Sequence, residues 1–116
     1  MNTRKIGGIN EEKALKYLQD NDFEILTHNY RCKVGEIDII AIKENILRFI
    51  EVKYRENDLY GNPLETINKT KQNRIIKASA WFLNENIQYQ NMQCSYDVIA
   101  ILDHDITYIF NSFGAM

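Results

Sequence analysis

Proline, cysteine and long apolar runs are all scarce in this chain of 116 residues. No repeat or low-complexity segment interrupts it, and its length predicts one domain, 1–116, able to bury a core. The two cysteines, Cys32 and Cys94, lack metal-ligand or disulfide spacing, which predicts reduced thiols in a cytoplasmic protein. No apolar run approaches the ~20 residues of a membrane helix, and none at the start suits a signal peptide, so we expect no membrane partner.

Basic residues are missing from the last third of the chain, where residues 78–116 hold four acids and no Lys or Arg. The net charge of −2 argues mildly against a nucleic-acid partner, because phosphate contacts usually need a basic footprint. Residues 31–77, however, hold ten of the fourteen Lys and Arg against seven acids, a balance of +3. Any nucleic-acid surface is therefore expected in this middle segment.

The segment Gly35–Arg55 predicts two strands joined by a tight turn at Glu44-Asn45. β-branched and apolar residues flank the turn, and polar residues form its tip. A two-residue loop at this place pairs Lys43 with Ile46, and this pair fixes the register of the whole hairpin.

Carried back along the two strands, this register places two acids opposite each other. Asp38 faces Glu51 and Glu36 faces Lys53, all on one side of the hairpin because side chains alternate. Directly opposed carboxylates lie about 5 Å apart, and like charges so placed are destabilising. The pair needs a compensating cation, either a divalent metal ion or Lys53. In the second case Lys53 would bridge Glu51 and Glu36 in a structural ion-pair network, and residue chemistry alone leaves both interpretations open.

The remaining patterns predict two helices and further strands. The expected elements are a helix from its cap Asn10 to about Gln19, a strand at 23–30, a loop at 56–65, a helix from Lys69 to about Leu83 capped by Asn68, and strands at 96–102 and 106–110. The order αβββαββ predicts an α/β fold, with an antiparallel three-strand meander in a mixed sheet flanked by two helices.

Glu11 lies on the apolar stripe of the first predicted helix with Leu15 and Leu18, so we expect its side chain to point toward the sheet. It is either a further acid of the site or a first-turn acid favoured by the helix dipole. His28 and His104 are expected to be solvated rather than metal ligands.

An ordered series of motifs resembles a known family. The motifs are Asn29-Tyr30-Arg31-Cys32, Gly35-Glu36-Ile37-Asp38, Phe49-Ile50-Glu51-Val52-Lys53-x-Arg55, Gly61-Asn62-Pro63, Lys71-Gln72 and Tyr96-Asp97-Val98. In these motifs, which cover nearly the whole chain, the sequence resembles the YraN-like family of small bacterial proteins. Asp38 with Glu51-Val52-Lys53 is similar to the Asp…Glu-x-Lys signature of restriction-endonuclease-like (PD-(D/E)XK) nucleases, which include relatives of archaeal Holliday-junction resolvases.

The resemblance implies a restriction-endonuclease-like core and a metal-dependent endonuclease that hydrolyses DNA, branched DNA included. Asp38, Glu51 and the Val52 carbonyl would hold Mg²⁺ or Mn²⁺, because these ions prefer oxygen ligands. Lys53 would position the attacking water or offset charge in the transition state. Glu11 matches a first-helix acid of these nucleases, and Glu36 would support Lys53. The alternative is a non-catalytic module that binds nucleic acid or a partner protein and retains the nuclease fold.

The expected nucleic-acid surface combines basic residues near the hairpin with the start of the second helix, where a helix N-terminus bearing cations favours anions. Its members are Arg31, Lys33, Arg55, Lys69, Lys71 and Gln72. Two positions depart from the family pattern: Asn10 replaces a glycine, and Ser95 replaces an arginine two residues before Asp97. The sequence leaves the oligomeric state open, a homodimer included.

Overall fold

The structure, a computed structural model, describes residues 3–55 and 67–113, with the backbone alone for residues 3–9. The loop predicted at 56–65 lies outside the described residues. The α-helices and strands follow the predicted order αβββαββ. They are α1 (Thr3–Asp20), β1 (Glu24–Cys32), β2 (Gly35–Lys43), β3 (Ile46–Arg55), α2 (Lys69–Glu85), the short 3₁₀ helix η2 (Ile87–Tyr89), β4 (Gln93–Leu102) and β5 (Asp105–Phe113). Neither described α-helix is long and apolar enough to cross a membrane.

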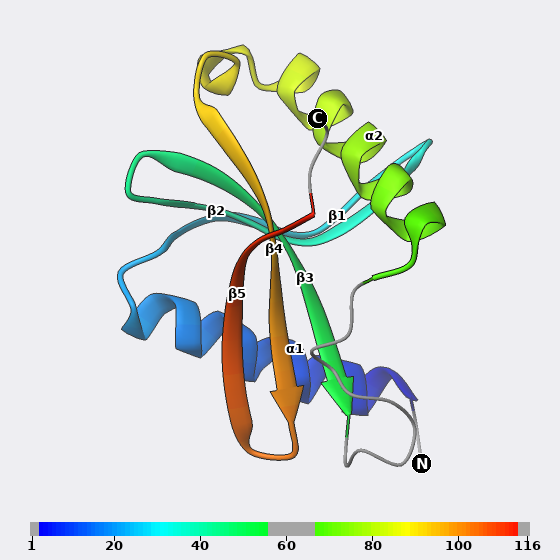
Figure 1. Cartoon of the computed structure of the whole chain (residues 1–116), viewed down its shortest axis with the longest axis vertical. Helices are drawn as coiled ribbons and strands as arrows, with labels where there is room; N and C mark the ends of the chain where they lie inside the picture. The colour runs from blue at the N-terminus through cyan, green and yellow to red at the C-terminus, as the bar shows by residue number, and fades with distance from the viewer. Residues whose placement is uncertain (1–2, 56–66, 114–116) are drawn as a thin grey trace.

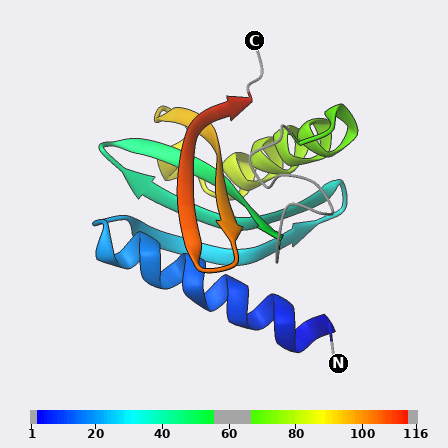
Figure 2. The same cartoon turned by 60° about the horizontal axis from the view of Figure 1, so that its bottom comes forward.

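The five strands form one mixed sheet in the order β1-β2-β3-β4-β5. The first three are an antiparallel meander, β4 runs parallel to β3, and β5 is antiparallel to β4. A parallel pair needs a crossover connection, and α2 lies in the connection between β3 and β4. α1 covers one face of the sheet and α2 the other (Figures 1 and 2). The predicted mixed sheet with two flanking helices is confirmed.

Each face of the sheet has its own apolar core, and β3 contributes to both. Phe49 packs in the core under α2, where its ring meets that of Phe82 edge-on at 6.2 Å. Ile50, the next residue, packs under α1 with Leu18 and Ile99. Successive strand residues point to opposite faces, so a central strand buried on both sides is apolar almost throughout.

The predicted hairpin turn and the predicted cap of the second helix are both confirmed. Glu44 and Asn45 have φ values of 57° and 62°, as a two-residue hairpin turn requires, and Lys43 pairs with Ile46. At the start of α2, the Asn68 side chain accepts the Lys71 N–H at 2.8 Å and caps the helix.

The predicted start of the first helix is wrong, because α1 begins at Thr3 and Asn10 lies inside it, 8% exposed. Glycine weakens a helix by about 1 kcal/mol without forbidding it, so Gly7-Gly8 does not stop the helix. Glu11 consequently lies well inside α1 rather than in its first turn. The helix-dipole interpretation of Glu11 therefore fails.

Candidate functional site

The alternation of side chains between the two faces breaks around Asp38. Ile37 packs in the core under α2, while Ile39, two residues later, packs in the core under α1. The neighbouring strand switches faces at the same level: His28 contacts α1, and Tyr30 packs on Phe82 of α2. Between them Asn29 has φ 54°, a left-handed conformation that asparagine tolerates better than most residues. Asp38 therefore lies where the regular pleat of the sheet is interrupted.

The β2–β3 ladder ends at the Ile39–Ile50 pair, one step before the acids. The predicted ladder pairs Asp38–Glu51 and Glu36–Lys53 are therefore wrong as backbone pairs, because β2 diverges from β3 beyond this point. In place of a ladder bond, the Val52 N–H donates to the Asp38 carboxylate at 2.8 Å. The N–H and C=O of a strand residue point to the same side, so the Val52 carbonyl also faces this gap.

The carboxyl groups of Asp38 and Glu51 nevertheless meet, and they share a hydrogen bond. Burial and the Asp38 charge raise the pKa of Glu51 to about 7. Burial also raises the pKa of Asp38, against the Val52 N–H bond, which lowers it. Hydrogen bonding between the acids raises the pKa of Glu51 and lowers that of Asp38.

The cation beside this pair is Lys71 of α2, which forms an ion pair with Glu51. The Glu51 side chain is 6% exposed and that of Lys71 is 52% exposed. Burial would lower the pKa of Lys71, but the hydrogen bond and charge of Glu51 outweigh it and raise that pKa. Glu51 thus has both an acid and an ammonium group as neighbours, and the two buried acids repel each other when both are ionised.

Lys53 shares the α2-facing side of β3 with Glu51. Glu51 is in register with Val98 and Lys53 with Ala100, and both partners belong to the core under α2. Paired residues of a sheet point to the same face, which puts Lys53 on the side of the acid pair. Glu36 is exposed and pairs with Arg31 at 3.5 Å, its register partner on β1.

Glu11 is brought to the sheet, as the apolar stripe predicted, but its partner is His28. The Glu11 carboxylate contacts the His28 ring nitrogen Nδ1 at 2.9 Å, and the Glu11 side chain is 22% exposed. His28 is therefore paired, contrary to the expectation that it is simply solvated. The contacts of Asp38 and Glu51 involve α2, whereas those of Glu11 are made on the α1 side of the sheet.

An open pocket of about 850 Å³ lies beside the acid pair, between the β1–β2 turn and the first turns of α2. Four basic side chains and one acid line it: Arg31, Lys33, Lys71, Arg74 and Glu36. The sequence prediction did not include Arg74. The absence of a side chain at Gly35 lets the β1–β2 turn approach α2 closely, because a Cβ there would lie 2.9 Å from the Arg74 carbonyl oxygen. Lys71 connects the pocket to the acid pair, because it lines the pocket and forms the ion pair with Glu51.

The other three predicted nucleic-acid contacts lie elsewhere. Gln72 is buried, and its side chain donates to the Ile67 carbonyl at 2.6 Å, so it holds the start of α2. Arg55 donates to the Tyr54 carbonyl at 2.8 Å, and Lys69 is exposed outside the pocket lining. The structure therefore gathers half of the predicted surface into one pocket.

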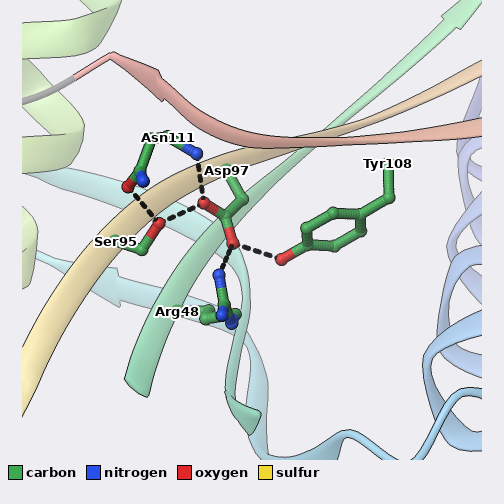
Figure 3. A network of polar contacts seen from close by, with 5 residues as sticks. All are labelled: Arg48, Ser95, Asp97, Tyr108 and Asn111. Carbon is green, nitrogen blue, oxygen red and sulfur yellow. Dashed lines mark hydrogen bonds and ion pairs between the residues drawn. The ribbon is translucent and has the colours of Figure 1, made fainter. Parts of the chain in front are cut away.

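A second buried charged cluster, which sequence reasoning missed, surrounds Asp97 of β4. The Arg48 guanidinium donates to the Asp97 carboxylate at 3.1 Å, and their side chains are 4% and 0% exposed. The Tyr108 hydroxyl and the Asn111 N–H also donate to Asp97, and Ser95 contacts it (Figure 3). The signal was available: Arg48 lies within the apolar run 46–50, and Asp97 directly precedes the apolar run 98–102.

Arg48 supplies the cation that the resemblance led us to expect at position 95, where this chain has Ser95. Arg48 and Ser95 are register partners on the parallel strands β3 and β4. The cation that Asp97 needs therefore comes from the neighbouring strand, at the same level of the sheet. The departure at Ser95 leaves Asp97 with a charged partner.

The acid pair fits a divalent cation by the chemistry of its donors. It offers buried carboxylate oxygens that repel each other and a backbone carbonyl facing the same gap. Within the described part of the chain no three His, Cys, Asp or Glu side chains group as metal ligands. Mg²⁺ commonly uses one or two carboxylates, with waters and substrate phosphates completing its shell, so two acids suffice.

The chain matches known protein sequences over most of its length. The model of the family described as "Uncharacterised protein family UPF0102" matches residues 10–101. A UPF0102 protein of Francisella tularensis subsp. novicida (strain U112) is 40% identical over 117 residues, which cover 100% of both chains. One of Lachnoclostridium phytofermentans is 40% identical over 115 residues, covering 99% of this chain and 98% of the relative. The resemblance to the YraN-like family is thereby confirmed, and the chain belongs to the UPF0102 family.

Proposed function

We propose that the protein is a metal-dependent nuclease that hydrolyses nucleic-acid phosphodiesters, DNA being the expected substrate, on a restriction-endonuclease-like fold. The observation that carries this proposal is the acid pair Asp38–Glu51 at the interrupted β2–β3 ladder, directly beside a basic pocket. A buried repulsive pair costs stability, and such perturbed acids in a cleft are typical of functional sites. An adjoining pocket lined by four cations supplies the phosphate contacts that a nuclease needs.

Asp38, Glu51 and the Val52 carbonyl would hold Mg²⁺ or Mn²⁺. When bound, such an ion polarises a phosphate and makes a water nucleophilic at neutral pH. Lys53, on the same side of β3 as Glu51, would orient the water or offset charge on the phosphate. Arg31, Lys33 and Arg74 would hold the flanking backbone in the pocket. Glu11, paired with His28 on the α1 side, would support the site from a distance.

A nuclease assay with a panel of substrates tests the proposal. Purified protein is incubated with linear, single-stranded and branched DNA, with and without Mn²⁺, and we expect metal-dependent cleavage of at least one. Lys53→Ala should reduce cleavage by about 10²-fold or more while leaving most of the DNA affinity, because the pocket cations remain. Lys77→Ala, which changes an exposed lysine of α2 outside the pocket, is the matched control and should change neither.

The second candidate is a binding module without catalysis. It is favoured by the ion pair of Lys71 with Glu51, which supplies the acid pair with a cation of the protein's own. If wild type binds the DNA panel but shows no metal-dependent cleavage of any member, the nuclease proposal fails and the binding module stands. In either case Lys33→Ala or Arg74→Ala should weaken DNA binding and make its salt dependence shallower, by about one unit of slope for each phosphate that the variant no longer neutralises.

A further inference from the structure

We propose that Lys71 couples the acid pair to the basic pocket, so that a divalent cation at the acids and a nucleic-acid backbone in the pocket favour each other's binding. The proposal rests on the metal site of the proposed function and adds a regulatory link to it. Lys71 belongs to both places: its ammonium pairs with Glu51, and its side chain lines the pocket beside Arg31, Lys33 and Arg74.

The backbone of Lys71 is fixed, but its side chain has room to move. Its N–H is held by the Asn68 side chain at 2.8 Å in the first turn of α2, a helix that is anchored beneath by Gln72 and Ile75. The Lys71 side chain is 52% exposed, in contrast to that of Glu51. Four rotatable bonds let the ammonium group leave Glu51 for the pocket without any movement of the helix.

One ammonium cannot serve two anionic sites at once, and this produces the coupling. When it contacts Glu51, it occupies the place of a divalent cation and would repel one. When a phosphate in the pocket attracts it, Glu51 is left to a metal ion. A metal ion at the acids, in turn, expels the ammonium toward the pocket and adds a positive charge there. By linkage, the two ligands must improve each other's affinity by the same factor.

The other pocket cations provide a matched comparison. Lys33 lines the same pocket on the β1–β2 turn, and its side chain has no ion pair or hydrogen bond within the described residues. Removing its charge should weaken phosphate binding as much as removing that of Lys71. It should leave the metal affinity of the acid pair unchanged, because Lys33 does not contact Glu51.

The test measures Mn²⁺ affinity by isothermal titration calorimetry in wild type, Lys71→Met and Lys33→Met. Each protein is titrated alone and with a saturating phosphorothioate single strand of about 12 nucleotides, which keeps the charge and resists hydrolysis. For wild type we expect the strand to tighten Mn²⁺ binding about fivefold or more. Lys71→Met alone should bind Mn²⁺ several-fold more tightly than wild type alone, and the strand should change its Mn²⁺ affinity little. Lys33→Met should keep the wild-type values at a saturating strand concentration.

Several outcomes would overturn the coupling. If Lys71→Met, shown to be folded by circular dichroism, binds Mn²⁺ no more tightly than wild type, Lys71 does not compete for the acids. If the strand still tightens Mn²⁺ binding in Lys71→Met as in wild type, the link runs through other residues. In both cases wild-type Mn²⁺ binding is intact, so the metal site of the proposed function stands. If wild type binds no Mn²⁺ with or without the strand, the metal site itself fails, and the coupling with it.

Discussion

Strand β3 carries two buried charged residues, Arg48 and Glu51, which lie three positions apart. Their electrostatic surroundings differ. Arg48 meets one acid, Asp97, which also accepts the Tyr108 hydroxyl and the Asn111 N–H (Figure 3). Glu51 meets another acid and the ammonium of a half-exposed lysine. The first cluster pairs one acid with one cation and is closed to water, and the second holds two mutually repelling acids beside an open pocket.

The comparison shows that burial alone does not separate a structural acid from a functional one. Asp97 is more deeply buried than Glu51, yet its donors compensate its charge in full. Within the described residues, the Nε–H of Arg48 is the buried side-chain group left without a partner. Charge balance is the better criterion, because a group that must bind a ligand ion cannot be fully compensated beforehand.

Breaking the balanced cluster should have the largest effect on stability. Arg48→Met leaves the Asp97 charge buried with neutral donors alone, and removing one partner of a buried ion pair costs about 3–5 kcal/mol. The free energy of unfolding from guanidinium denaturation measures the loss. The double change Arg48→Met with Asp97→Leu should recover part of it, because no uncompensated charge remains. A loss below about 1 kcal/mol, typical of surface ion pairs, would show that the cluster is not closed.

The unbalanced pair should instead respond to metal ions. Mg²⁺ or Mn²⁺ that binds the folded state alone stabilises it by about 2.7 kcal/mol at a hundredfold excess over Kd. The melting temperature of wild type should therefore rise with metal concentration, and Asp38→Asn should remove most of this rise. Tyr108→Phe, which alters the balanced cluster, should keep the full response. A wild-type melting temperature that ignores millimolar metal would exclude a tight site.

The pH dependence of metal-free stability should also differ between the clusters. The pKa of Glu51 is about 7 in the folded protein, compared with 4.5 for a glutamate side chain free in water. The folded state therefore binds the proton more tightly than the unfolded state. The contribution of Glu51 to the free energy of unfolding is therefore largest at low pH. It decreases as the pH rises from 4.5 to about 7 and is constant above pH 7. We expect this fall to be on the order of 2 kcal/mol and to vanish in Glu51→Gln. Denaturation curves across this range measure it, and identical pH profiles for wild type and Glu51→Gln would contradict the assignment.

Two isosteric changes should have opposite signs. Tyr108→Phe removes one hydrogen bond to the buried Asp97 carboxylate and should cost about 1.5–3 kcal/mol. Asp38→Asn keeps an acceptor for the Val52 N–H and removes the repulsion with Glu51, so we expect metal-free stability at pH 8 to be unchanged or about 1 kcal/mol higher. Thermal unfolding of both variants without metal measures the two effects. Equal destabilisation by Asp38→Asn and by Tyr108→Phe would contradict this prediction.

The sequence predicted well those features that depend on neighbouring residues. The Glu44-Asn45 turn and the Asn68 cap each follow from local backbone chemistry, and both were placed correctly. The register from this turn held up to Ile39–Ile50 and then failed, because strand divergence depends on what packs against β2. The start of α1 was missed since glycine lowers helix propensity without forbidding a helix.

The partners of the acids were harder to predict because they depend on how a helix docks on the sheet. The sequence brought Asp38 and Glu51 together correctly, but it did not consider Lys71 as an ammonium partner of Glu51. Lys71 was predicted as part of the nucleic-acid surface, and only the position of α2 on the sheet sets its side chain beside Glu51. Arg74 was overlooked for the same reason, since its place in the pocket follows from the close approach at Gly35.

The origin of the acid pair in a single hairpin has a consequence for how the chain folds. Asp38 and Glu51 come from strands joined by a two-residue turn, so their contact closes early, as local contacts do. Lys71 arrives only when α2 docks, and β4 can then add to β3 through a much longer loop closure. Until that moment the nascent hairpin must hold its two acids together without the Lys71 ammonium. A proton or a divalent ion would relieve their repulsion at this stage, and the docking of α2 would then bring Lys71 to take its place.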